Sequence, residues 1–460
     1  MNFRFLPIAL SALLAGCTTA TQSQKKFSVA TAATNQLGLE LYRQLAASNP
    51  GENIILSPLS IQSALAVAYA GADGETRTEM ASVLHFPADD ATLAASLESL
   101  QDALGEAVKK AHGAKDGYAD IYRRQKESIQ KQLQELMAKG EAVPPAWDGI
   151  LPFLDELIKD FDSQSTALRM ANGIFGQTGY EYREPFLNFV RDRYGSPLQQ
   201  FNFAADANAA RLGINAWVAS QTENQIRDAL PAGSVNANTR LVLLNALYFK
   251  AYWNIPFVKE YTYDLPFQVR GTQMADVPIM RQTAIMGYTR RNGYTVVALP
   301  YLGGDLQFLI LLPDDPTGVD ALAAKITPKL LGDFAKLNPR KVNLLFPRFN
   351  IEPPALALAN MLQAIGLKTV FDLPPGSANF DRIAAHQPDH YLALNDILHK
   401  TSLLLDEYGT VATASSVGQV VSIGIEEREA VVVVDHPFLF AIQHRDSGAC
   451  LFLGRVTDPR

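Results

Sequence analysis

The spacing of apolar residues predicts several helices in the first part of the chain. Leu37, Leu41 and Leu45 recur at helical spacing, which predicts an amphipathic helix over 30–47. A break at Ser57-Pro58 follows, and the mostly apolar run 60–69 predicts a buried helix. A third helix is expected over 75–84.

The rest of the chain mixes strands with helices. Nearly continuous apolar runs predict strands that are buried on both faces, and these cover 241–249, 294–299, 306–312 and 342–346. Helices are expected over 205–220 and 355–365, and the last strands over 430–434, 438–443 and 450–456. Because strands and helices do not alternate regularly, the pattern indicates an α+β fold rather than a doubly wound sheet.

Region 105–147 is polar and differs from its surroundings. It predicts a helix over 118–139, which a Pro144-Pro145 stop follows. The charges are mixed in sign, which is typical of a solvated helical excursion. The alternative is a regulatory or glycan-binding surface, which would be formed by Lys109, Lys110, Arg123, Arg124 and Lys126.

Composition narrows the class of protein. The 460 residues are 48% hydrophobic and carry a formal net charge of -7, so the chain can bury a large core and lacks the basic balance of a nucleic-acid binder. The two cysteines, Cys17 and Cys450, cannot form a disulfide framework because Cys17 lies in a short N-terminal segment that is expected to be a leader.

The N-terminus has the features of an exported protein. A short positive region over 2–4 precedes an apolar segment over 5–14 that is too short to span a bilayer. It ends in Leu14-Ala15-Gly16-Cys17, which resembles a bacterial lipobox with Cys17 as the lipidated first mature residue. The alternative is an ordinary signal peptide with an incidental cysteine.

These features predict a signal peptide over 1–16, a polar tether over 17–29, and one folded domain over 30–460 with a charged insertion near 105–147. The residue after Cys17 is not Asp, which favours sorting to the outer membrane. We therefore expect a lipid-anchored protein of the bacterial cell envelope that faces the periplasm or the surface.

Enzyme signatures are absent from the sequence. It contains no G-x-S-x-G, H-E-x-x-H, Walker, G-x-G-x-x-G or C-x-x-C motif. His386 and His390 lie four apart, but Pro388 between them opposes the helix that a metal pair would need. We expect no catalysis, cofactor or metal, although a hydrolase triad assembled in space stays open.

Four segments in order along the chain resemble the serpin family of serine protease inhibitors. They are NIILSPLSI at 53–61, NALYFKAYW at 245–253, DEYGTVA at 406–412, and HPFLF at 436–440 with GRVTDP at 454–459. The resemblance implies a single domain with three β-sheets, about eight or nine helices and an exposed reactive loop.

The resemblance also implies a function. A serine protease, or possibly a cysteine protease, would cleave the loop, which would then insert into the central sheet and trap the acyl-enzyme in a covalent 1:1 complex with a monomeric inhibitor. The alternative is a non-inhibitory serpin that acts as a binding or carrier module. The family's hinge maps onto Glu407 and Gly409, where glycine supplies backbone freedom.

The residues after the hinge are suited to becoming a strand. The face expected to point inward is small and uncharged, and its members are Thr410, Ala412, Ala414 and Ser416. The other face is rich in β-favouring residues, and no proline lies between Glu407 and Glu427. A flexible linker would match this composition but not its strand propensity.

In the family the scissile bond follows the residue about sixteen positions beyond the hinge glutamate, so the resemblance implies Ile423-Gly424 as the scissile bond, with Val421-Ser422 as the second choice. No Lys or Arg lies between Lys400 and Arg428, which favours elastase-like or subtilisin-like targets over trypsin-like ones. Cleavage at Arg428 is the remaining alternative.

Supporting residues follow from the resemblance as well. A polar shutter beneath the opening sheet would consist of Ser57, Ser60, Asn215 and His399. Arg348 and Glu407 would form an ion pair at the base of the loop, in the region called the breach, with Trp253 packed nearby.

Overall fold

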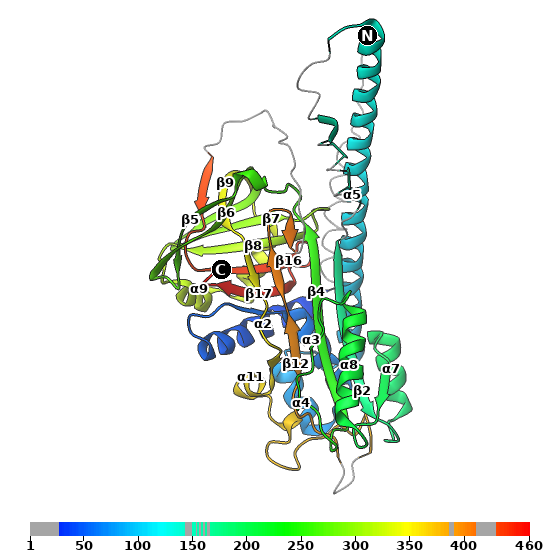
Figure 1. The fold of residues 1–460 in the computed structure, drawn as a ribbon. Helices are drawn as coiled ribbons and strands as arrows, with labels where there is room; N and C mark the ends of the chain where they lie inside the picture. Colours follow the sequence, from blue (N-terminus) through cyan, green and yellow to red (C-terminus); the bar gives the residue numbers. More distant parts are fainter. Residues whose placement is uncertain are drawn as a thin grey trace, which may run out of the picture.

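The computed structural model describes residues 27–142, 150–385, 391–410 and 429–460, apart from 153, 156–157, 160–161 and 163–165. Two β-sheets form the body, and Figure 1 shows one helix, α5, running along one side and beyond the end of the body. The fold is a single α+β domain, as expected. In the part of the chain described, no helix is both long and apolar enough to cross a membrane.

The first three helices match the sequence pattern closely. They are α2 (Ser28–Ser48), α3 (Pro58–Gly71) and α4 (Gly74–Val83). The expected break at Ser57-Pro58 is the start of α3, since Ser57 is the N-cap and its hydroxyl accepts a hydrogen bond from Ser60 N at 3.3 Å. Pro58 occupies the first helical position, where its missing N–H costs nothing.

Helix α5 (Asp90–Lys139) is one helix of 50 residues, about 75 Å long at 1.5 Å per residue. The helix expected from Tyr118 therefore begins too late. Asp89 caps the helix by accepting hydrogen bonds from Ala91 N and Thr92 N, and its glycines do not interrupt it. The helix ends before Pro144 because Gly140 adopts a left-handed conformation with φ 67°.

Within the described residues the first sheet has nine strands, eight of which follow one another in a hydrogen-bonded path. In order they are β1 (Ile54–Leu56), β17 (Cys450–Val456), β16 (Phe438–His444), β8 (Leu306–Pro313), β7 (Tyr294–Pro300), β6 (Gln273–Arg291), β9 (Pro339–Pro347) and β15 (Ala430–Val433). Strand β5 (Tyr263–Val269) pairs with β6 off this path.

The second sheet contains β10 (Phe349–Ile351), β13 (Leu403–Leu405), β14 (Gly409–Thr410), β4 (Leu241–Tyr252), β12 (Leu398–Thr401) and β11 (Leu356–Ala357), with β2 (Ala167–Gln177) beside β4 and β3 (Leu198–Phe201) beside β2. Backbone hydrogen bonds connect the described strands within these two sheets. The 19-residue β6 pairs with β5, β9 and β7 in turn and joins them into one sheet.

Further helices whose bounds are described are α7 (Glu184–Tyr194), α8 (Ala207–Gln221), α9 (Val319–Lys325), α10 (Pro328–Asp333) and α11 (Ala359–Ala364). Helix α11 is shorter than the expected 355–365 because Leu356 and Ala357 pair with β12 as a strand.

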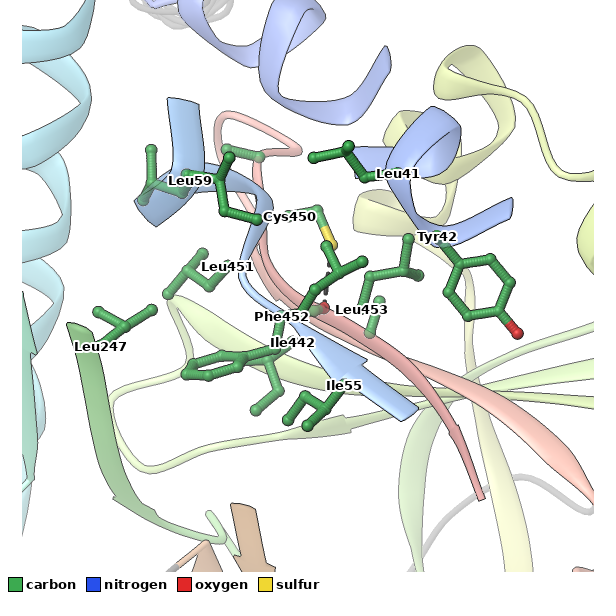
Figure 2. Packing of buried hydrophobic residues seen from close by; sticks show 14 of the residues in the cluster. Leu41, Tyr42, Ile55, Leu59, Leu247, Ile442, Cys450, Leu451, Phe452 and Leu453 are labelled. Atoms are coloured by element: carbon green, nitrogen blue, oxygen red, sulfur yellow. Dashed lines mark hydrogen bonds between the residues drawn. The ribbon is translucent and has the colours of Figure 1, made fainter. Parts of the chain in front are cut away.

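The core lies between helices α2 and α3 and the β1–β17–β16 side of the first sheet. Figure 2 shows Leu41 and Leu59 from the helices close to Ile55 and Leu453 from the strands. Cys450 is fully buried there, and its thiol donates to Phe452 O at 3.0 Å. Burial raises the pKa of this thiol far above its usual range, so it is an inert core residue.

Candidate functional site: a sheet parted at the hinge

Two residues of the expected hinge already lie inside the second sheet. Strand β14 pairs antiparallel with β4, with Gly409 opposite Tyr252 and Thr410 opposite Ala251. On its other side, Thr410 lies opposite Leu405 of β13. The hinge therefore occupies a strand position between β13 and β4.

Farther along the same sheet, that position is closed. Strand β12 pairs directly with β4 in parallel, and residues 398–401 lie opposite 244–247. Figure 1 shows β12 beside the long β4. The sheet is therefore parted at one end by two residues and intact at the other.

Gly409 is required by the close approach of β14 to β4. A Cβ atom at this position would lie 2.0 Å from Ala251 O and 2.8 Å from Tyr252 Cα. Both neighbours are backbone atoms, which cannot rotate away. This reason for glycine adds to the backbone freedom that the sequence indicated.

Thr410 is fully buried and hydrogen-bonded to the core. Its hydroxyl lies 2.7 Å from the hydroxyl of Tyr301. The Tyr301 ring stacks on Trp253 with a centroid distance of 4.7 Å and an interplanar angle of 9°. Burial raises the pKa of Tyr301 well above its usual range, so the phenol stays protonated.

Glu407 has a buried side chain with two polar neighbours. Its Oε1 accepts a hydrogen bond from Thr262 Oγ1 at 2.8 Å and lies 3.7 Å from Arg348 Nη1. The expected Arg348–Glu407 pair is therefore present but long, and the Arg348 side chain is 43% exposed. Thr262 makes the shorter contact, and no sequence motif indicated it.

The backbone around Glu407 is held by Trp253 and by Asp406. Trp253 Nε1 donates to Asp406 O at 3.0 Å, and Trp253 N donates to Tyr408 O at 2.8 Å. The Asp406 carboxylate accepts from Tyr408 N at 2.9 Å and from Gly409 N at 3.2 Å. Burial raises the pKa of Asp406 to about 6, although these two N–H groups oppose the shift.

Tyr408 connects the hinge to the long helix. Its ring packs in a small buried cluster with Tyr252 and Leu302, against which Ala114 of α5 also packs. Lys110 of the same helix pairs with Asp305 at 2.6 Å. Helix α5 is thus fastened to the body beside the hinge.

Three of the four expected shutter residues meet in a buried polar cluster. His399 Nε2 accepts a hydrogen bond from Ser57 N at 3.0 Å, and its Nδ1 lies 3.2 Å from Asn245 Oδ1. Ser60 Oγ also donates to Asn245 Oδ1. Burial lowers the pKa of His399 to about 3, so a neutral imidazole that donates from Nδ1 fits this network.

Asn215 does not join that cluster, which corrects its expected place. It lies on α8, where Nδ2 donates to Leu230 O at 3.0 Å and Oδ1 accepts from Leu230 N at 2.8 Å. Its amide is used to hold the segment after α8. Asn245 of β4 takes the central position instead.

Four of the five basic residues considered as a binding surface on α5 have acidic partners. Lys109 pairs with Glu106 at 2.7 Å, Arg123 pairs with Asp120 at 2.7 Å and with Asp162, and Lys126 pairs with Asp155. With Lys110 bound to Asp305, these cations are matched by nearby carboxylates. The geometry favours a solvated helix over a glycan-binding surface.

Several predicted residues lie outside the described part of the chain. These are Cys17, His386, His390, Ala412, Ala414, Ser416, Val421, Ser422, Ile423, Gly424 and Arg428. Among the residues that are described, no group of three or more His, Cys, Asp or Glu could hold a metal ion.

Comparison with known proteins covers almost the whole chain. The family model described as Serpin (serine protease inhibitor) matches residues 32–459. Serpin B10 of Otolemur garnettii is 31% identical over 430 residues, covering 92% of this chain and 98% of that protein. Leukocyte elastase inhibitor of Sus scrofa is 31% identical over 441 residues, covering 93% and 99%.

Solved structures agree with this match. Uncleaved ovalbumin has a TM-score of 0.71 at 26% identity and covers 93% of this chain and 99% of its own. Native protease nexin-1 with heparin has a TM-score of 0.69 at 25% identity, covering 94% and 100%. The sequence relatives named are animal proteins and give no support to a bacterial lipoprotein. The match over 32–459, with the hinge and sheets described above, shows that this chain belongs to the serpin family.

Proposed function

We propose that this chain inhibits serine-type endopeptidases as a suicide substrate rather than acting as an enzyme or a carrier. The observation that carries the proposal is the pairing of Gly409 and Thr410 between β13 and β4. These residues begin the strand that the cleaved loop would complete. The names of relatives such as leukocyte elastase inhibitor support the same activity.

The register of β14 specifies what further insertion would bring together. If the strand continues in register with β4, Ala412 comes opposite Phe249 and Ala414 opposite Leu247, both buried core residues. Ser416 then comes opposite Asn245, the position that His399 now takes. Small uncharged side chains are needed at each of these places because the core beneath is filled.

Insertion also has a defined structural cost. The four residue pairs between β12 and β4 have to separate before a new strand can enter. The new strand would then pair with β12 on one side and with β4 on the other, so two ladders of hydrogen bonds would replace the one that is broken. The buried shutter cluster of Ser60, Asn245 and His399 lies at this point of separation.

The covalent chemistry belongs to the protease. Its serine Oγ adds to the carbonyl of the scissile residue, the peptide C–N bond breaks, and the new amine leaves with a proton, which gives an acyl-enzyme. A cysteine protease would form the equivalent thioester. We propose Ile423-Gly424 as the bond, with Val421-Ser422 second, and an elastase-like or subtilisin-like enzyme with an apolar specificity pocket as the target.

Mixing the protein with pancreatic elastase or subtilisin tests the proposal. A band at the summed mass that survives a denaturing gel is expected, and mass spectrometry of the released fragment identifies the bond. Clean cleavage without such a band would favour the binding or carrier alternative.

We also propose that a lipid on Cys17 anchors the protein to a bacterial cell envelope. This proposal rests on the Leu14-Ala15-Gly16-Cys17 sequence and the polar segment after it.

A further inference from the structure

The outer face of strands β6, β9 and β15 carries exposed apolar residues. In the register of these strands, Thr283, Asn343 and Val431 form one cross-strand row. The neighbouring rows are Arg281, Leu345 and Val433 on one side, and Ile285, Lys341 and the adjoining Glu429 on the other. We name these residues the outer face.

Three of the apolar residues on the outer face are well exposed. Val431 is 65% exposed, Ile285 is 55% exposed and Val433 is 41% exposed. The alternating residues Val342, Leu344 and Val432 point the opposite way and are buried in the core. The core therefore does not account for the exposed valines, whereas a contact with another molecule would.

The charges on the outer face are largely balanced. Lys341 pairs with Glu429 at 3.1 Å, and Arg281 Nε donates to Asn343 Oδ1 at 3.4 Å. Arg281 adds one exposed positive charge beside the apolar residues. A complementary partner would present apolar side chains bordered by a carboxylate.

The position of the outer face identifies the partner. Strand β15 is the last strand of the sheet path, and residues 411–428, which hold the bonds proposed for cleavage, precede it directly in the sequence. The bonds proposed for cleavage lie five to eight residues before Glu429, a span of at most about 17–28 Å. A protease domain of about 220 residues has a radius of gyration of about 17 Å, so its body is wider than that span.

We propose that the outer face docks the body of the target protease and increases the rate of its capture. This inference rests on the proposed function, because it takes the scissile bond to lie in the 411–428 loop. The contact involves Ile285, Val431 and Val433, with Arg281 facing a carboxylate of the protease. It acts in the first encounter and is independent of strand insertion.

The test compares the intact protein with an Ile285→Thr, Val431→Thr, Val433→Thr variant. Threonine keeps the β-branched shape and the strand propensity but removes apolar surface. The association rate constant with pancreatic elastase and with subtilisin is expected to fall at least about fivefold with one or both enzymes. The number of inhibitor molecules needed per protease is expected to stay unchanged.

Leu212→Gln is the matched control. Leu212 is 52% exposed on α8, away from the outer face, and its substitution is expected to leave the rate unchanged. Arg281→Glu is expected to slow association as well, and more so at low salt than at high salt.

Failure of the proposed function and failure of the docking proposal give different experimental results. If the intact protein forms no stable complex, the proposed function is wrong, and the rate of loop cleavage by the same proteases still reports on docking. Unchanged rates for the triple variant with both enzymes would overturn the docking proposal alone. Dimers of the intact protein that the triple variant abolishes would instead assign the outer face to a second copy of this chain.

Discussion

The hydroxyl groups of Thr410 and Tyr301 lie 2.7 Å apart in the core, so the hinge is hydrogen-bonded into the sheet that it has begun to enter. Tyr301 is stacked on Trp253, whose indole N–H holds the backbone of Asp406. One continuous set of contacts therefore links Thr410 to the segment before the hinge.

Replacing Thr410 with arginine should convert the inhibitor into a substrate. The position is fully buried, and an unpaired charge there costs several kcal/mol. Gels of elastase mixtures should show cleaved protein and little complex. Thr410→Ser keeps the hydroxyl and should inhibit almost normally, while efficient trapping by Thr410→Arg would refute the hinge assignment.

Substituting Gly409 should push β14 away from β4 before any cleavage. An alanine Cβ would collide with Ala251 O, so we expect faster hydrogen exchange in β14 and at the end of β4. Gly332→Ala is a suitable control because a Cβ at that helical glycine meets nothing within 4 Å. Equal exchange in the Gly409→Ala protein would show that the close approach is not maintained in solution.

Thr262 should matter more to hinge stability than Arg348. Thr262→Val leaves the buried Glu407 carboxylate without its 2.8 Å donor, a loss of about 1–3 kcal/mol. Arg348→Ala removes a longer and half-exposed partner, which is worth about 0–1 kcal/mol. Urea denaturation of the two variants measures the difference, and the reverse order would make the ion pair the dominant contact.

Two buried groups should give opposite dependences of stability on pH. The pKa of His399 is lowered to about 3 from 6.5, so its contribution is complete above pH 6.5 and is lost as the pH falls toward 3. The pKa of Asp406 is raised to about 6 from 3.8, so its contribution is complete below pH 3.8 and is lost as the pH rises through 6.

Variants separate these two effects. The stability that the intact protein has over His399→Gln should shrink from pH 7 to pH 4, because only the intact protein must exclude that proton from its core. The stability of the intact protein relative to Asp406→Asn should grow over the same range. Thermal unfolding at several pH values measures both, and parallel curves would contradict the assigned pKa directions.

Cys17→Ser should release the protein from membranes if the cysteine carries a lipid. Fractionation of bacterial cells that express each form measures this, with the intact protein in the membrane fraction and the variant in the soluble one. Equal distribution of the two forms would mean that the leader is an ordinary signal peptide.

Much of the fold was predictable because its signals are local. Leucine spacing predicted α2, and nearly continuous apolar runs predicted β4, β7 and β8. Strand β6 was missed because polar residues interrupt it, and its length is set by pairing with three neighbours. The early start of α5 had a signal in Leu93, Leu97, Leu100 and Leu104, which lie at helical spacing and are buried.

Site residues that belong to a sequence motif were predictable. Site residues that are brought together only by tertiary packing were not. Asn245 is the only polar residue in the apolar run 241–249, which is a signal for the shutter position wrongly given to Asn215. Thr262 offered no such signal, since its contact with Glu407 joins residues 145 apart in the chain. Side-chain partners of that kind depend on the finished fold.

The parted end of the sheet has a kinetic consequence for trapping. Starting a strand is slow because several residues must be ordered before pairing stabilises them, whereas extending one adds a pair for each residue ordered. Since Gly409 and Thr410 are already paired, the slow start is complete before a protease arrives. Trapping then depends on whether strand extension is faster than hydrolysis of the acyl bond. A strand that is already started favours extension.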